Sequence, residues 1–217
     1  MARALRRRGE VVNLKRVRRL CRLRGLLVKQ KRRKKRLGIG VGMPCRAEYP
    51  NHVWAYDFVE DRAETGRKLR ILTIIDEFTR RCIEVEVEHR MNAKFVARTL
   101  MRLFQVHGTP TFIRSDNGPE FIARAIRDYL EKAGVGTWYI APGSPWQNGF
   151  AESLGSRFRD EVLNAELFAD GQEAREGAGG GVGEYNHRRP HSALGYRTPA
   201  AFAATEKEDQ PTLITAG

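Results

Sequence analysis

Three apolar stretches with the period of a β-strand occur close together in the chain. Within the first of them, Val53, Ala55 and Val59 alternate with Trp54 and Phe58, so the two sets point to opposite faces. Short turns separate the stretches, which predicts an antiparallel meander. The three predicted strands cover residues 53–59, 69–75 and 83–87.

Helical and strand periods alternate after the meander. Gly108 and Pro110 end the first helical segment and Gly134 ends the second, while Asp116 ends the strand between them. The predicted elements are a helix over 95–104, a strand over 111–113, a helix over 122–130, a strand over 137–140 and a helix over 144–164. The order βββαβαβα predicts an α/β fold with a mixed five-stranded sheet flanked by helices.

Positive charge is concentrated at the amino terminus. The 217 residues carry a net charge of +13, yet residues 1–40 hold 17 Lys and Arg and a single acid, so they contribute +16 and the remainder sums to −3. Within this arm, Asn13 can cap a short helix that Gly25 ends. A basic arm on a near-neutral body favours a nucleic-acid partner, and a merely solvated tail is the alternative.

Other global features point to an unexported protein. The three cysteines are scattered and form no C-x-x-C pair, so neither a disulfide framework nor a zinc knuckle is indicated. No apolar stretch of signal-peptide or membrane-spanning length follows the charged amino terminus. We therefore expect a cytoplasmic protein with no membrane partner.

Three carboxylates on different predicted elements are candidate metal ligands. Asp57 lies within the first strand, Asp116 lies just beyond the fourth, and Glu152 lies on the helix after the fifth. If the first and fourth strands are neighbours, all three acids can meet at one place. Like charges that close repel unless divalent cations lie between them, and oxygen ligands suit Mg²⁺ or Mn²⁺.

The helix that carries Glu152 has an apolar and a polar face. Its core-facing positions are spaced i, i+4, i+8: Phe150, Leu154 and Phe158. The residues within about 40 degrees of Glu152 on a helical wheel are Asn148, Ser156 and Arg159. Taken alone, this pattern is also that of an ordinary solvent-exposed face.

Four motifs together resemble a known family. WAYDFVEDR, LTIIDEFTR, IRSDNGPEF and SPWQNGFAES follow one another in that order, and YNHRRPHSALGYRTPAAF follows them. This set resembles the catalytic core of retroviral integrases and bacterial insertion-sequence transposases, most closely the orfB product of the IS-three family. The 35 residues between Asp116 and Glu152 match the family's D, D, E spacing.

The resemblance implies an RNase H-like fold and a two-metal phosphoryl transfer on DNA. Asp57, Asp116 and Glu152 would hold two Mg²⁺ or Mn²⁺ ions for donor-end cleavage and strand transfer. The implied DNA-contacting residues are Asn117, Asn148 and Arg159. Charge alone predicts a further DNA contact, the run of like charge Lys31, Arg32, Arg33, Lys34, Lys35 and Arg36. Implied partners are the element's terminal inverted repeats, target DNA, further copies of the chain and a separate orfA product.

The chain departs from the family pattern at two places. The segment before VNLKRV looks like a truncated helix-turn-helix region. EAREGAGGGVGEYN stands where the family has a long amphipathic helix, and its glycines predict that no stable helix forms there. These departures leave two alternatives to a transposase: an inactive remnant that only binds DNA, and a metal-dependent nuclease without strand transfer.

The expected organisation has three parts. Residues 1–47 form the basic arm, a remnant of a helix-turn-helix region. Residues 48–165 form the integrase catalytic core. Residues 166–217 form a C-terminal segment with the Gly-rich stretch and the YN..RPH signature.

Overall fold

The computed structural model describes residues 13–26, 46–115, 123–139, 148–163, 168 and 170–208. The chain forms two compact units, Met1–Met43 and Pro44–Gly217. In the first unit, helix α2 (Leu14–Leu23) begins where Asn13 Oδ1 accepts a hydrogen bond from the Lys15 N–H at 2.9 Å. Gly25 follows with φ 66°, which confirms both predicted ends of this helix. The basic run 31–36 lies outside the described residues.

The second unit is built on a mixed five-stranded sheet. Its strands are β1 (Val53–Arg62), β2 (Lys68–Asp76), β3 (Cys82–Glu88), β4 (Phe112–Ser115) and β5 (Gly136–Tyr139), in the order β3-β2-β1-β4-β5. β1, β2 and β3 pair antiparallel, and β4 pairs parallel with both β1 and β5. The predicted meander is therefore confirmed, and the condition that the first and fourth strands be neighbours is met.

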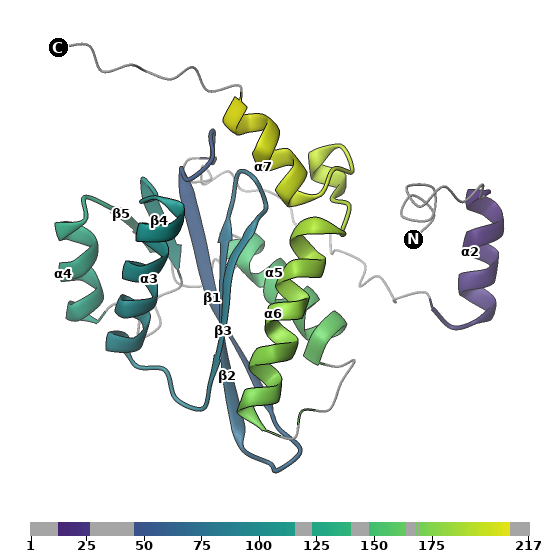
Figure 1. The fold of residues 1–217 in the computed structure, drawn as a ribbon, viewed down its shortest axis with the longest axis horizontal. Coiled ribbons are helices and arrows are strands. Elements are labelled where there is room, and N and C mark those ends of the chain that lie inside the picture. Colours follow the sequence, from purple (N-terminus) through teal and green to yellow (C-terminus); the bar gives the residue numbers. More distant parts are fainter. Residues whose placement is uncertain are drawn as a thin grey trace, which may run out of the picture. The chain divides into compact units, whose positions relative to one another are not determined.

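Helices cover both faces of the sheet (Figure 1). On one face, α3 (Ala93–His107) and α4 (Arg124–Lys132) bury Trp54 and Tyr56 of β1. On the other, α5 (Gly149–Phe158), the π-helical turn η2 (Arg159–Leu163) and α6 (Gly171–His187) bury Ala55 and Val59 of β1. Because Asp57 lies between Ala55 and Val59 in the alternation, it is on the face that α5 covers.

Helix α6 forms, so the prediction that the Gly-rich segment stays irregular is wrong. The helix runs unbroken through its glycines from an amino-terminal cap in which Asp170 Oδ1 accepts from the N–H groups of Gln172 and Glu173 at 2.8 and 3.1 Å. Burial of Ala174 and Ala178 against the β3 side of the sheet stabilises it. Tertiary packing therefore outweighs the low helix propensity of glycine.

Two side chains attach α6 to the outer edge of β3. Arg175 Nε donates to the Val87 carbonyl at 3.0 Å, and its guanidinium pairs with Glu88. The buried Asn186 amide accepts from the Cys82 N–H at 2.9 Å and donates to the Cys82 carbonyl at 2.8 Å. Asn186 thus satisfies both backbone groups of Cys82 as a neighbouring strand would.

Replacing Gly179 or Gly180 with Ala is expected to stabilise the protein by roughly 0.5–1 kcal/mol each. Both are exposed, and an added Cβ meets nothing within 4 Å. The matched control is Gly177→Ala, whose Cβ would lie 2.7 Å from Phe168 Cε1 and should give no gain. Urea unfolding followed by circular dichroism measures all three, and equal gains at the three positions would contradict this packing.

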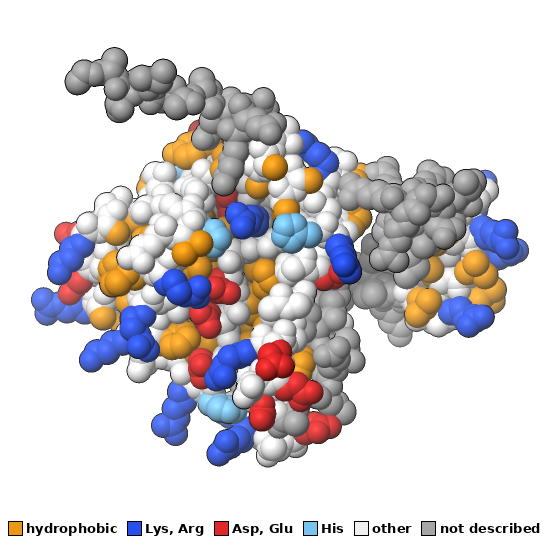
Figure 2. Space-filling view, viewed as in Figure 1, with side chains coloured by type: hydrophobic (Ala, Val, Ile, Leu, Met, Phe, Trp, Pro, Cys, Tyr) orange, Lys and Arg blue, Asp and Glu red, His pale blue; other side chains and the backbone are white. Residues whose placement is uncertain are grey.

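The last elements of the described residues are a short 3₁₀ turn, η3 (Ser192–Leu194), and α7 (Pro199–Glu208). Figure 2 shows that acidic side chains gather near the first turns of α6, where Asp170, Glu173 and Glu176 are exposed.

None of the described helices has the length and apolar run needed to cross a membrane.

Candidate active site

Helix α5, which carries Glu152, packs along the part of β1 that carries Asp57. At the start of α5, Asn148 Nδ2 donates to the Tyr56 carbonyl at 3.3 Å. Near its end, Gly155 packs on Val59. Glu152 lies between these two anchors on α5, as Asp57 lies between Tyr56 and Val59 on β1. The predicted meeting of strand and helix is therefore present in the fold.

Gly155 sets how closely α5 approaches the strand. A Cβ at this position would lie only 2.7 Å from Val59 Cγ2, so a larger residue would push the helix outward. Leu154 and Phe158 are buried and Phe150 is partly buried, which confirms the predicted core face of this helix. The close approach of Gly155 holds α5 against the middle of β1.

The two acids differ in exposure. Asp57 is partly buried, and its Oδ1 accepts from the Phe58 N–H at 2.9 Å. Glu152 is exposed. Asp116 and Asn117 lie outside the described residues, directly after Ser115 at the end of β4. β4 runs parallel to β1, with Ala55 opposite Arg114. Ser115, the last residue of β4, therefore lies on the strand that neighbours the one carrying Asp57.

Asn148 does not lie on the exposed face predicted from the helical wheel. It is only 2% exposed because it precedes the helix, with ψ 20°, and turns its amide onto the β1 backbone. Burial is incompatible with the predicted DNA contact in this conformation. The side chain instead fixes the start of α5 against the strand that carries Asp57.

Arg159 stands where α5 changes into a π-helical turn. Its side chain is exposed, and Nη2 donates to the Glu60 carbonyl at 2.9 Å. Such π turns inside α-helices occur frequently at functional sites. The hydrogen bond holds the guanidinium beside β1, at a residue three positions after Asp57 on that strand.

The donor set fits a hard divalent cation. Within the part of the chain that the structure describes, no group of three or more His, Cys, Asp or Glu side chains could hold a metal. Asp116 lies outside the described residues, and Asp57 and Glu152 alone supply two carboxylates. Carboxylate oxygens together with water and phosphate oxygens are the ligands that Mg²⁺ prefers.

A buried ion pair supports β4 just before Asp116. Arg114 Nη1 lies 2.9 and 3.0 Å from the two Glu77 carboxylate oxygens, and both side chains are almost fully buried. Desolvation raises the pKa of Glu77 to about 7, against the attraction of Arg114 and Arg80. Sequence reasoning missed this pair; the available signal was an acid, Glu77, directly after a continuous apolar strand.

Asp76, next to Glu77, shapes the turn after β2. Its Oδ1 accepts from the Phe78 N–H at 2.9 Å, and its Oδ2 accepts from the Asn51 N–H at 3.1 Å. Burial raises the pKa of this carboxyl, and these hydrogen bonds oppose the shift. Asp76 therefore caps the turn between β2 and β3.

Comparison with known proteins identifies the family. Two family models, both described as integrase core domain, match residues 47–145 and 133–199. An insertion element IS407 protein of Burkholderia multivorans, described as an uncharacterized 31.7 kDa protein, is 38% identical over 93% of this chain and 73% of its own length. The chain belongs to the integrase core family of insertion-sequence transposases. This confirms the family resemblance found in the motifs.

Other relatives of this integrase core come from further insertion sequences. An IS476 protein of Xanthomonas euvesicatoria is 36% identical over 92% of the chain, which spans 58% of that protein. The transposase of IS904 from Lactococcus lactis is 28% identical, with 89% of the chain and 81% of that protein covered. The integrase core thus corresponds to more than half of each relative.

A solved structure supports the RNase H-like fold. The HTLV-2 integrase catalytic core domain, described in complex with magnesium and in trimeric form, superposes with a TM-score of 0.61. The match covers 73% of this chain and 99% of that one at 14% sequence identity. At this identity the comparison shows the fold alone, and it confirms the predicted fold class.

Proposed function

We propose that this integrase core catalyses metal-dependent DNA end cleavage and strand transfer, with Asp57, Asp116 and Glu152 as the metal ligands. One observation carries the proposal: α5, which bears Glu152, packs along the segment of β1 that bears Asp57. Asp116 lies outside the described residues and directly follows Ser115 in the sequence, the last residue of β4, which is the parallel neighbour of β1. This order supports the proposal that Asp116 joins the other two acids.

The chemistry is an in-line displacement at phosphorus. In cleavage, a water oxygen attacks a phosphodiester at the donor end, and the bond to the leaving 3′-oxygen breaks. In strand transfer, the released 3′-hydroxyl attacks a target phosphodiester, and a target 3′-oxygen leaves. Two bound Mg²⁺ or Mn²⁺ ions would supply the Lewis acidity that both displacements need. A magnesium complex of a structural relative is consistent with this cofactor.

The remaining predicted contacts serve to hold DNA. Arg159, fixed beside β1 by the Glu60 carbonyl, is placed to meet a DNA phosphate near the acids. The basic run 31–36 and Asn117 are proposed as further DNA contacts. We also propose that the chain works as an oligomer, as the trimeric description of the HTLV-2 core suggests for that protein, together with an orfA product.

An inactive DNA-binding remnant is less well supported than an active enzyme. That alternative followed in part from a Gly-rich segment expected to remain irregular. α6 forms there and completes the core behind α5.

A single assay tests the proposal. Full-length protein is incubated with labelled duplex carrying an end of its element, a supercoiled target and Mn²⁺. Cleaved and joined products are expected, and both should disappear when EDTA removes the metal and return when Mn²⁺ is restored. Cleavage without joining would establish the nuclease alternative, and bound but uncut DNA would establish the remnant.

A further inference from the structure

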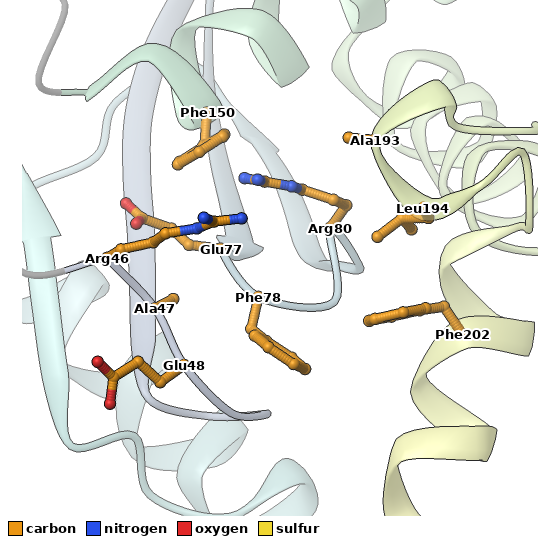
Figure 3. A pocket seen from close by; sticks show the side chains of 10 residues that line it. All are labelled: Arg46, Ala47, Glu48, Glu77, Phe78, Arg80, Phe150, Ala193, Leu194 and Phe202. Atoms are coloured by element: carbon orange, nitrogen blue, oxygen red, sulfur yellow. The ribbon is translucent and has the colours of Figure 1, made fainter.

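A pocket opens at the end of the sheet where β1 begins. Its volume is about 460 Å³, within the range of roughly 300–1,000 Å³ typical of small-ligand sites. Residues from distant parts of the sequence line it, including Arg46, Arg80, Glu77, Phe150, Leu194 and Phe202 (Figure 3). The start of α5, the helix that carries Glu152, and the segment that follows the YN..RPH signature thus line the same cavity.

Arg80 is the central cation of this pocket. Its backbone has φ 60° at the end of the β2–β3 turn, and its guanidinium carbon lies 3.5 Å from the centre of the Phe150 ring. The Nη1 atom is buried and has no hydrogen-bond partner among the described residues. Burial lowers the pKa of this guanidinium, opposed by the nearby Glu77. An incoming anion would supply the missing hydrogen-bond acceptor.

Further positive charge surrounds the same corner of the fold. Arg157 of α5 and Arg189 after α6 act, together with Arg80, on the half-buried His191. Burial and these three cations lower the pKa of His191 to about 4, so its imidazole is neutral at physiological pH. The His191 ring packs edge-on against Tyr185, with centroids 4.8 Å apart. The three cations Arg80, Arg157 and Arg189 therefore lie around an uncharged imidazole, that of His191.

Two carboxylates also line the pocket but do not neutralise its centre. Glu77 is bound at both oxygens by Arg114. The Glu48 carboxylate points away from Arg80 and Phe150 (Figure 3). The guanidinium groups of Arg46 and Arg80 point toward one another beside the Phe150 ring (Figure 3).

We propose that this pocket binds one unpaired nucleotide of DNA, its phosphate at Arg46 and Arg80 and its base against the rings of Phe150 and Phe202. Cationic groups combined with aromatic faces are the usual recognition elements for single-stranded nucleic acid. A base held in a duplex stack cannot reach such a cavity, so the nucleotide must be unpaired. The inference rests on the proposed function, because it supplies the DNA that an integrase core handles.

The test fills the pocket from its rim. Ala193 is exposed on η3 and lines the cavity, so Ala193→Trp should block it with little effect on folding. The matched control is Ala204→Trp, on an exposed position of α7 outside the pocket. Full-length proteins are titrated into fluorescein-labelled oligothymidylate, with EDTA present, and fluorescence anisotropy gives Kd.

Blocking the pocket is expected to weaken oligothymidylate binding about tenfold, the size of one lost base stack. The control should bind like the wild type. An abasic strand of the same length should bind the wild type about tenfold more weakly than oligothymidylate, and Ala193→Trp should weaken binding of the abasic strand less than it weakens binding of oligothymidylate. A second variant, Arg80→Gln, should weaken binding of both strands because it removes a phosphate contact. Equal melting temperatures would show that the variants remain folded.

Unchanged oligothymidylate affinity in folded Ala193→Trp and Arg80→Gln would overturn the proposal. So would an equal loss of affinity for oligothymidylate and the abasic strand in Ala193→Trp, since the base would then not be in the pocket. Because binding is measured without metal, these results are independent of catalysis. If the wild type failed to cleave DNA while Ala193→Trp still lost oligothymidylate affinity, the proposed reaction would be refuted and the proposed nucleotide pocket would stand.

Discussion

Replacing Asp57 with Asn is expected to lower both end cleavage and strand transfer by about a thousandfold. The amide keeps the size of the side chain but removes the negative charge that would hold a divalent cation against DNA phosphate. A metal ion contributes several kcal/mol to such a displacement, and about 4 kcal/mol corresponds to a thousandfold in rate. Initial rates on labelled end duplex with saturating Mn²⁺ measure the effect.

Glu60→Gln is the matched control for this substitution. Glu60 lies on the same strand three residues later, is exposed, and points to the opposite face of the sheet. It should retain wild-type rates, while Asp116→Asn and Glu152→Gln should lose as much activity as Asp57→Asn. Near-normal cleavage by folded Asp57→Asn would show that Asp57 is not a metal ligand. It would also contradict the proposed site made of Asp57, Asp116 and Glu152.

The sheet and its helices could be predicted because hydrophobic periodicity follows directly from burial. β1 alternates between the two cores, and the helix that carries Glu152 buries Leu154 and Phe158 as its spacing requires. The same periodicity placed Asp57 on a strand and Glu152 on a polar helix face. The position of the candidate site followed once β1 and β4 proved to be neighbours.

Features that depend on tertiary contacts were not predictable in the same way. The α6 segment has little intrinsic helix propensity, and its helical state depends on Asp170 at its start and on the contacts of Ala174, Ala178 and Asn186 with the core and β3. Asn148 appears polar and exposed on a helical wheel. Its burial follows from its position before the first helical turn, where the wheel does not apply.

Replacing Arg114 with Met is expected to destabilise the protein by about 3–5 kcal/mol, because it leaves the Glu77 carboxylate buried without its partner. The midpoint of thermal unfolding should fall by about 6–20 °C for a unit of this size. A double variant, Arg114→Met with Glu77→Leu, should recover most of this loss since no charge then remains buried. Circular dichroism melting of the single and double variants measures both effects.

The surface provides the matched control for this pair. Arg124 lies 3.5 Å from Asp128, with side chains 88% and 52% exposed, so Arg124→Met should change stability by no more than about 0.5 kcal/mol. A similar small change in Arg114→Met would mean that the Glu77–Arg114 pair does not stabilise β4.

The destabilisation by Arg114→Met should also depend on pH in a defined direction. The Glu77 carboxyl has an ordinary pKa of 4.5, which burial raises to about 7 in the folded protein, and loss of Arg114 removes an interaction that lowers it. Ionisation of Glu77 in the folded state therefore reduces stability as the pH rises from about 4.5 toward 7. The difference between wild type and Arg114→Met should be largest above pH 7 and shrink toward pH 4.5. If it grew on acidification instead, Glu77 would not be the group left unpaired, and the support for β4 ahead of Asp116 would have another source.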